Sequence, residues 1–282
     1  MIVSNLTIER SCRVIDTSFD FTTDTPGYWD GFWERNYGLG AGGADPDSDS
    51  PTLQEYHRTL WSRVLPNGEQ MNLASGYGSN YLTWKHFRFG SDAFIVSFLY
   101  LRYQEMLNKV AKLLPDYRAF VEDYMRRSYT IGGMIIFPKH NGSINQRRGC
   151  NRMICDRMDL TLECIRRFYA GQESPLSTTL ENDREFFELF QDFEGYIDFF
   201  FLQDWVDSNY DPIIFGDWNG EFYADPLPKT PKEYLKWIAF ELDLLDKRNR
   251  RIGEFQGKAL CLEQVPEGRR PKGSWEVKKR SG

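Results

Sequence analysis

The chain has 282 residues, and its hydrophobic fraction of 41% and charged fraction of 27% are typical of a folded globular protein. These fractions exclude a collagen-like, low-complexity or wholly disordered chain. The net charge of −6 also disfavours a general polyanion binder, because repulsion opposes DNA or RNA wherever basic side chains are not clustered.

Neither the start of the chain nor its cysteines indicate export. Residues 1–10 lack the basic and apolar stretches of a signal peptide, and no apolar run approaches the roughly 20 residues that span a bilayer. The five cysteines are irregularly spaced and form no Cys-x-x-Cys pair, which argues against a disulfide framework or a zinc ribbon. We therefore expect a cytoplasmic protein with reduced thiols, no membrane association and no metal.

The N-terminal part combines acidic and aromatic side chains. Residues 16–49 contain eight acidic residues against one base, Arg35, and aromatic residues are interleaved with the acids. Because disordered segments carry few aromatic residues, we expect the segment 16–51 to pack on the body of the protein.

Strands are predicted mainly in the first half of the chain. Asn67-Gly68 is a strong hairpin turn, since both positions tolerate positive φ, and it predicts a strand on either side. A further strand is expected over 81–89, and the apolar run 131–138, bounded by Gly and Pro, predicts a buried strand. The other elements expected in this half are a helix capped by Thr52, an extension of the sheet and two more helices, over 52–61, 94–98, 99–114 and 116–127.

Helices are predicted after the buried strand. The spacing of apolar side chains predicts a packed helix over 156–170. A capping box that begins at Thr178 opens a second helical stretch, interrupted near Gly195. A third helix is expected to begin at Thr230-Pro231 and to run toward Gly253.

Strands that come early and helices that come late form an α+β pattern rather than alternating βαβ units. We predict a mixed or antiparallel sheet from the N-terminal half, packed against a helical C-terminal half. Residues 1–252 are expected to form a single domain, and the basic residues 253–282 a mobile tail.

The candidate binding site is a basic stretch of the chain. Residues 124–155 contain six Lys or Arg and no acid, so this segment carries +6 in a chain of −6. A polar loop that follows a buried strand and precedes a helix is a natural anion site, and guanidinium groups bind phosphate through two hydrogen bonds. The predicted ligand- or phosphate-binding residues of this loop are Asn145, Gln146, Arg147, Arg148 and Arg152. Two alternatives stay open: structural pairing of the arginines with the acidic N-terminal segment, and a partner surface.

Candidate catalytic groups lie near the same loop. Three acids share one face of the helix over 156–170; Asp156 is suited to capping, whereas Glu163 lies too far into the helix to cap and is the better catalytic carboxylate. His140 precedes the arginines and is a candidate acid or base. The three histidines show no metal-ligand spacing, and no Walker loop, Gly-x-Ser-x-Gly or His-Glu-x-x-His motif occurs, which removes many common enzyme classes.

Three runs of the chain are long and specific: TIGGMIIFP from Thr130, SINQRRG from Ser143 and DRMDLTLECIRRFY from Asp156. They are similar to an uncharacterised bacterial family that is known only as a domain of unknown function. The resemblance covers about residues 15–252 and implies one continuous domain. It brings no activity, substrate or catalytic residue with it.

The first function that the residues leave open is an enzyme of toxin or phage-defence type, which transfers ADP-ribose from NAD to a nucleic acid. Such a transferase needs a basic residue early in the sheet, a serine or threonine on a later strand and a late carboxylate. Arg63, Ser91 and Glu163 follow that order, with Arg63 and Glu163 as catalytic groups and Ser91 in ligand binding. NAD is then the expected cofactor.

Two further functions stay open. A metal-independent ribonuclease would use His140 as its acid or base, with Arg147 and Arg148 stabilising the pentacoordinate phosphate. A non-catalytic protein would instead dock a partner, such as an antitoxin-like protein, on its acidic and aromatic N-terminal segment.

Overall fold

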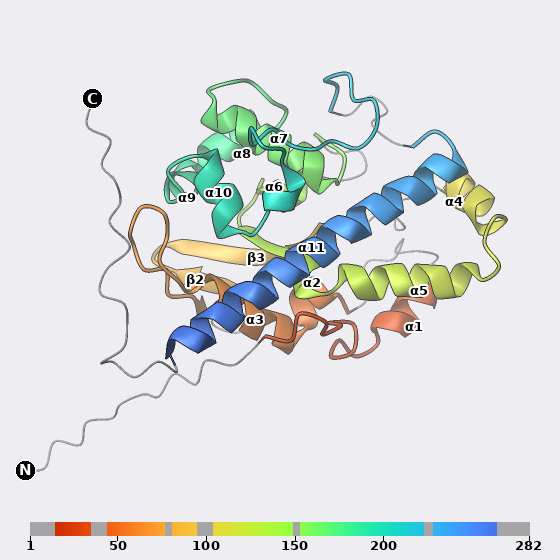
Figure 1. Ribbon diagram of the computed structural model, residues 1–282, viewed down its shortest axis with the longest axis horizontal. Helices are drawn as coiled ribbons and strands as arrows, with labels where there is room; N and C mark the ends of the chain where they lie inside the picture. The colour runs from red at the N-terminus through yellow and green to blue at the C-terminus, as the bar shows by residue number, and fades with distance from the viewer. Residues whose placement is uncertain are drawn as a thin grey trace, which may run out of the picture.

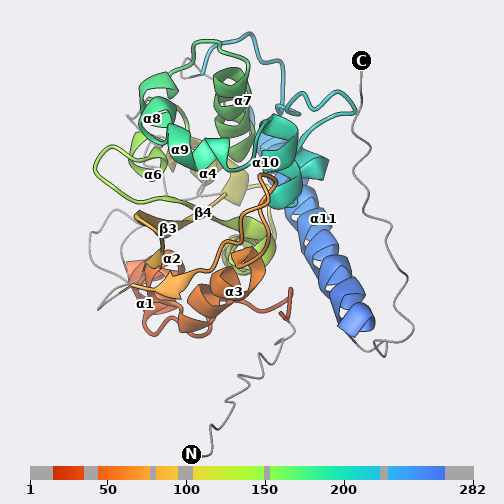
Figure 2. The same ribbon diagram turned by 90° about the vertical axis from the view of Figure 1, so that its left-hand side faces the viewer.

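The computed structural model describes residues 15–34, 44–76, 81–94, 104–148, 153–222 and 228–263. Within these ranges the fold is α+β, as the order of the elements predicts, and a small sheet lies between two sets of helices (Figure 1). The turned view in Figure 2 places helices of the C-terminal half above this sheet and the short N-terminal helices below it.

The sheet is antiparallel throughout, with its strands in the order β1-β2-β3-β4. The strands are β1 (Ala74–Ser75), β2 (Leu82–Trp84), β3 (Phe87–Ala93) and β4 (Met134–Pro138). In the longest pairing, Ser91 of β3 lies opposite Ile136 of β4. Every residue of β4 is buried, which matches the buried strand predicted from the apolar run. The strand is preceded by the short 3-10 helix η3 (Ile131–Gly133).

The stretch 81–89 is a hairpin, and the prediction of a single strand is wrong. Trp84 pairs with Phe87, so Lys85 and His86 form a two-residue loop between β2 and β3. Lys85 has a φ of 52°, which reverses the chain and breaks the alternation of the strand.

The Asn67-Gly68 turn is present, with Gly68 at a φ of 87°. Its flanks meet only in an isolated bridge between Val64 and Gln70, so they form no extended strand pair. The turn signal therefore predicts the reversal correctly but not the length of the strands.

The first half of the chain contributes five helices to the described structure: α1 (Tyr28–Glu34), α2 (Pro46–Asp49), α3 (Pro51–Trp61), α4 (Gln104–Ala111) and α5 (Tyr117–Ser128). Helix α3 is capped by Ser50, whose hydroxyl accepts a hydrogen bond from the backbone N–H of Leu53 at 3.0 Å, and not by Thr52 as predicted. The described part of the expected helix 99–114 forms α4, which ends at Ala111 rather than at residue 114. Residues 95–103, which include most of the expected sheet extension, lie outside the described ranges.

The second half is helical in the described ranges, as predicted: α6 (Ile144–Arg147), α7 (Met158–Tyr169), α8 (Ser177–Asn182), α9 (Arg184–Glu188), α10 (Phe193–Phe199), the 3-10 helix η4 (Gln203–Trp205) and α11 (Pro231–Glu263). The capping box at Thr178 is a wrong prediction, because α8 already begins at Ser177 and Glu181 pairs with Arg184 instead. The predicted interruption of this helical stretch lies between α9 and α10, before Asp192. The side chain of Asp192 caps α10 by accepting from the N–H of Gly195 at 2.7 Å.

The start of α11 forms as predicted. Thr230 Oγ1 accepts from the N–H of Glu233 at 3.2 Å, and Glu233 Oε2 accepts from the N–H of Lys229 at 2.8 Å. The Thr230 bond is that of a capping box, whereas the Glu233 carboxylate bonds one residue before the cap, and the helix continues past Gly253 to Glu263.

The acidic and aromatic N-terminal segment packs on the body in its described part. Phe21, Tyr28 and Phe32 are buried. Asp20 accepts from the Arg126 guanidinium at 3.0 Å, and the same guanidinium lies 4.7 Å from the centre of the Trp29 ring. One arginine of the basic stretch thus pairs with the acidic segment, as the structural alternative requires.

Candidate functional site

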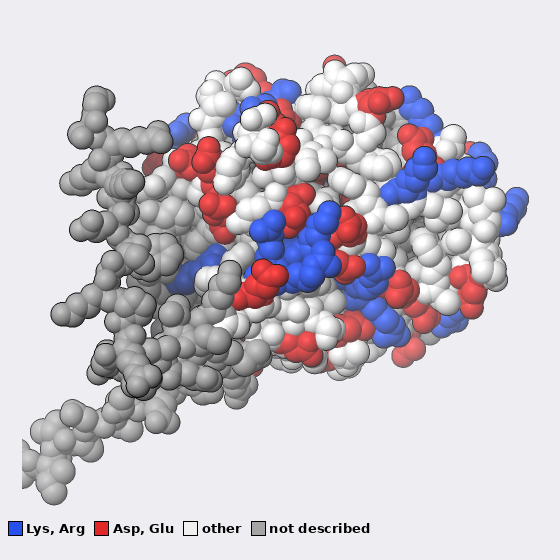
Figure 3. All heavy atoms as spheres, in the orientation of Figure 1, with Lys and Arg blue, Asp and Glu red and all other residues white. Residues whose placement is uncertain are grey.

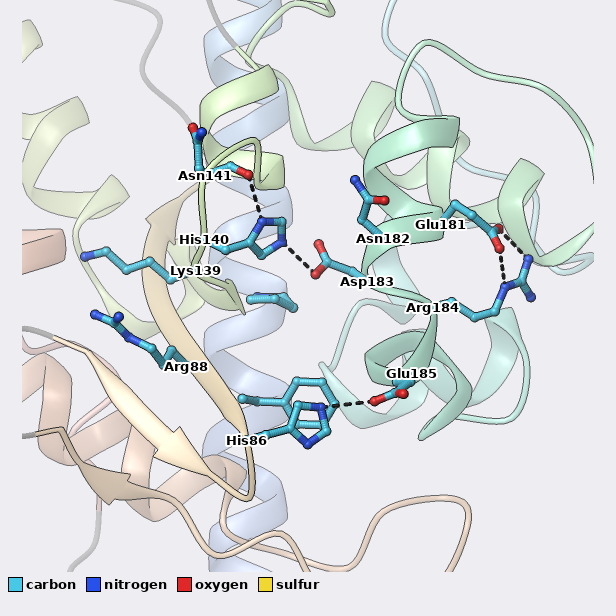
Figure 4. A pocket seen from close by; sticks show the side chains of 12 residues that line it. His86, Arg88, Lys139, His140, Asn141, Glu181, Asn182, Asp183, Arg184 and Glu185 are labelled. Carbon is cyan, nitrogen blue, oxygen red and sulfur yellow. Dashed lines mark hydrogen bonds and ion pairs between the residues drawn. The ribbon is translucent and has the colours of Figure 1, made fainter.

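A cavity of about 690 Å³ opens between the end of the sheet and the α8–α9 helices (Figure 4). Pockets that hold small organic ligands usually measure about 300–1,000 Å³. One wall, here called the strand wall, is formed by His86, Phe87, Arg88, Pro138, Lys139, His140 and Asn141. The other, the helical wall, is formed by Glu181, Asn182, Asp183, Arg184 and Glu185.

Local backbone geometry places the two histidines of the strand wall. His86 occupies the two-residue loop between β2 and β3. At the end of β4, the N–H of Lys139 donates to the carbonyl of Arg88 at 2.8 Å, which holds the following His140 beside β3. Gly142, at a φ of 83°, then turns the chain into α6.

His140 and Asp183 join the two walls. His140 Nε2 lies 2.8 Å from Asp183 Oδ1, and Nδ1 lies 3.0 Å from the carbonyl oxygen of Asn141. Because both ring nitrogens face acceptors, the arrangement is satisfied only when both carry a proton. Partial burial disfavours the imidazolium, but the bonds to Asn141 and to Asp183 outweigh it and raise the pKa of His140. His140 is therefore suited to act as an acid.

Asp183 contributes a second feature to the site. The residue is only 7% exposed, and burial raises the pKa of its carboxyl although His140 opposes that rise. Its Oδ2 is enclosed and accepts no hydrogen bond from the described residues. Buried polar atoms are nearly always bonded, so this oxygen is an exception beside the cavity, and its lack of a donor fits the raised pKa of the carboxyl.

His86 and Glu185 form a second link across the cavity. His86 Nε2 lies 3.0 Å from Glu185 Oε2, and both side chains are well exposed. Figure 4 shows the two imidazoles at different heights of the strand wall, each directed at a carboxylate of the helical wall. With the Nε2 proton directed at Glu185, the Nδ1 of His86 is left as an acceptor.

The charges of the two walls differ in sign. Arg88 and Lys139 are exposed and form no ion pair with a carboxylate of the described residues. Both residues line the cavity, and in Figure 4 their charged ends extend from the strand wall on the side away from Asp183. The acids of the helical wall are paired, Glu181 with Arg184 and the other two with the histidines. Among the described lining residues, the charges without an ion-pair partner are thus positive.

The face that carries α5 and α11 is also charged. Figure 3 shows a group of Lys and Arg side chains at its centre, with Asp and Glu side chains directly around them. Arg127, for example, lies 2.6 Å from Asp246, and Lys247 lies 2.6 Å from Asp243. Such pairs neutralise the charge that a polyanion would need.

The three residues expected to act in ADP-ribose transfer do not line the cavity, and each is engaged elsewhere. The Arg63 guanidinium is enclosed by aromatic rings, with the centres of Phe199 and Phe201 at 4.3 and 4.4 Å, and burial lowers its pKa to about 9. Glu163 is buried and accepts from Arg166 at 2.8 Å and from Arg167 at 2.7 Å.

Ser91 contacts a histidine but is not activated by it. Its hydroxyl lies 2.9 Å from His57 Nε2, and the indole N–H of Trp61 donates to His57 Nδ1 at 2.9 Å. Because Nδ1 is an acceptor, Nε2 carries the proton and cannot remove one from Ser91. Burial also lowers the pKa of His57 to about 3, which keeps the ring neutral.

The polar residues of the predicted anion loop hold the fold together. Asn145 donates to the carbonyl of Ser91 at 3.2 Å, and Gln146 Oε1 accepts from the N–H of Gly142 at 2.7 Å. Arg147 is exposed and lies against Gly142. Arg152 lies outside the described residues.

Arg148 is enclosed between carboxylates. Its side chain is 1% exposed, and its guanidinium lies 3.1 Å from Asp92 and 2.6 Å from Asp156. A role in ligand binding would require it to leave both partners. Of the residues predicted for the site, only His140 lines the cavity.

Sequence reasoning missed Asp183, which contacts His140, and His86, the second histidine of the cavity. Asp183 follows His140 by 43 residues, and His86 lies in the loop between β2 and β3. The one available sign was a histidine at the end of a buried strand. Within the described ranges, His, Cys, Asp and Glu side chains form no group of three that could hold a metal ion.

Comparison with known proteins gives one match. A family of unknown function, DUF6994, matches residues 15–252. No curated protein and no solved structure matched the chain. No helix of the described structure is both long and apolar enough to cross a bilayer.

Proposed function

We propose, for a chain that belongs to the DUF6994 family of unknown function, an activity drawn from its cavity: cleavage of the RNA backbone by acid–base catalysis through His140 and His86. One observation carries the proposal. Two histidines face the same cavity, and each is held at Nε2 by a carboxylate of the opposite wall. Fixing one ring nitrogen orients the other for proton transfer.

The chemistry of the lining favours a substrate that brings its own nucleophile. Among the described residues that line the cavity there is no Ser, Thr or Cys. RNA supplies such a nucleophile in its 2′-hydroxyl group. A histidine pair then needs only to remove one proton and to deliver another.

His86 Nδ1 takes the proton of the 2′-hydroxyl, and the 2′-oxygen forms a bond to phosphorus. The bond from phosphorus to the 5′-oxygen breaks, and that oxygen takes a proton from His140 Nδ1. The products are a 2′,3′-cyclic phosphate and a 5′-hydroxyl. His140 Nδ1 now donates to the exposed carbonyl of Asn141, which the leaving oxygen would replace.

The charge distribution supports the same reaction. The strand wall carries two basic side chains, Arg88 and Lys139, that have no ion-pair partner among the described residues, whereas the three acids of the helical wall are each paired. These two cations would attract the phosphate backbone. Transfer of ADP-ribose has less support, because Arg63, Ser91 and Glu163 do not line this cavity.

The test is cleavage of a labelled single-stranded RNA in the presence of EDTA. We expect products with a 2′,3′-cyclic phosphate, and no cut at a position that carries a single 2′-deoxy substitution. His140→Gln and His86→Gln should each lower kcat/KM by about 10²–10⁴-fold. Lys109→Gln on α4, purified in parallel, is the control for contaminating nucleases.

Two results would contradict the proposal. Equal cleavage by both histidine variants and the unmodified protein would assign the activity to a contaminant. Consumption of labelled NAD, with label appearing in RNA, DNA or protein and no RNA cleavage, would instead restore the transferase reading.

A further inference from the structure

A second, smaller cavity of about 270 Å³ adjoins the main one. Both are lined by His86, Phe87 and Glu185, so the two cavities meet at the second histidine–carboxylate link. The smaller cavity adds Asn67, Lys85, Glu188 and Leu189 to its lining. The histidine that we assign as the base therefore lies between two adjoining compartments.

Phe87 gives this junction an aromatic surface. Its side chain is half-buried, and its ring packs against Trp84 with centres 6.2 Å apart and an angle of 18° between the planes. The His86 ring lies 4.1 Å from the Phe87 ring, so Trp84, Phe87 and His86 form one group of packed rings beside both cavities. Aromatic side chains are the usual contacts of unpaired bases.

Lys85 is the one Lys or Arg among the described residues that line the smaller cavity. Its ammonium contacts Glu69 and lies 4.6 Å from the centre of the Trp84 ring, and its side chain is 48% exposed. The residue has a φ of 52°, a conformation that favours Gly or Asn. The ion pair with Glu69 and the contact with Trp84 hold this lysine beside the smaller cavity.

We infer that the two cavities form one groove for single-stranded RNA of more than two nucleotides, with Lys85 binding a phosphate outside the cleaved bond. This inference rests on the proposed function, because it takes His86 as the centre of the reaction. A base can contact this group of rings only when it is unpaired, since the bases of a duplex are stacked on each other. The cleaved position then occupies the main cavity, and the neighbouring nucleotide occupies the smaller one.

The experiment compares substrates of two, three and six nucleotides in cleavage, and their 2′-O-methyl analogues in binding. The analogues lack the nucleophile, so fluorescence anisotropy measures their affinity without turnover. We expect both kcat/KM and affinity to rise by about tenfold or more beyond the dinucleotide, as stacking of one additional base provides. A duplex of the same sequence should bind at least about tenfold more weakly.

Lys85→Asn tests the assigned phosphate contact. Asn tolerates the left-handed backbone of this turn, so the fold is retained while the charge is removed. We expect the gain with length to shrink and the salt dependence of binding to fall by about 0.7 in its log–log slope. Lys109→Asn is the matched control, since Lys109 is also an exposed lysine paired with a glutamate.

The outcomes separate this inference from the proposed function. Cleavage of all lengths at equal kcat/KM would overturn the groove and leave the ribonuclease intact. Length-dependent binding of the analogues without any cleavage would support the groove and overturn the ribonuclease. An unchanged length dependence in Lys85→Asn would remove Lys85 from the site.

Discussion

His140 Nε2 lies 2.8 Å from Asp183 Oδ1, and this contact joins the end of a buried strand to the junction of two short helices. His140 Nδ1 also faces an acceptor, the carbonyl of Asn141. An imidazole with two acceptors at its nitrogens is held in its charged form. The protonation state of His140 is therefore linked to the contact between the strand wall and the helical wall.

The stability of the protein should depend on this proton. The pKa of His140 is raised in the folded state, so the folded protein binds more protons than the unfolded chain above the unfolded value of about 6.5. The contribution is fully present below that value and is lost as the pH rises through the folded pKa. We expect urea unfolding to show a lower free energy of unfolding at about pH 8 than at about pH 6.5.

His140→Gln provides the comparison, because glutamine can bond to Asp183 without titrating. The difference in stability between the two proteins should shrink as the pH rises over this range. Two other groups titrate near this range. The lowered pKa of His57 contributes only below about 6.5. Burial raises the pKa of Asp92 to about 7, inside the range, but Asp92 is present in both proteins and its effect cancels in the difference. A pH-independent difference would show that His140 is neutral in the folded state.

The two adjacent arginines of the basic loop should behave differently. Arg148 lies between Asp92 and Asp156, so Arg148→Ala leaves buried carboxylates without their cation and should cost about 3–5 kcal/mol of unfolding free energy. Arg147 is exposed, and Arg147→Ala should change stability by less than about 0.5 kcal/mol. Urea denaturation of both variants gives the comparison. A stable Arg148→Ala protein that had lost ligand binding would instead support the prediction that this loop binds an anion.

The elements predicted correctly are those whose signal is local. The apolar run before Pro138 and the apolar spacing of α7 depend only on burial, and both predict the observed element to within a few residues. The helix cap at Thr230 is equally local. The hairpin at Lys85 was missed because its loop uses Lys and His where a Gly or Asn would have marked the turn.

The site was less predictable because its pairings are distant in sequence. The basic stretch is charged as the sequence indicates, but the guanidinium of Arg148 is enclosed within the fold. It is paired with Asp92, which the fold brings from β3. His140 was a candidate for its place after the strand. Nothing in the sequence near it marks Asp183, which contributes the carboxylate from a helix junction.

Gly133 is expected to be indispensable at the start of β4. A Cβ at this position would lie 1.9 Å from the carbonyl oxygen of Ser128, which is backbone and cannot rotate away. Gly133→Ala should therefore lower the free energy of unfolding by about 3 kcal/mol or more. Gly257→Ala is the control, because no atom lies within 4 Å of its added Cβ and alanine favours the helix by about 0.5–1 kcal/mol. Thermal unfolding of both variants tests this prediction. A Gly133→Ala protein as stable as the unmodified protein would contradict the close contact between residue 133 and the carbonyl oxygen of Ser128.

Asp183→Asn tests whether Asp183 acts through His140. The carboxylate raises the pKa of His140, and asparagine keeps a similar shape without the charge. If His140 is the acid, activity falls as the pH rises through its pKa. Removing the carboxylate lowers that pKa, so the alkaline limb of the kcat/KM profile should move to lower pH. Glu185→Gln, which alters the other histidine–carboxylate link, should leave the alkaline limb where it is. A profile of Asp183→Asn that merely drops in height at every pH would assign Asp183 a structural role, and a shift of the same limb in Glu185→Gln would assign the acid to His86.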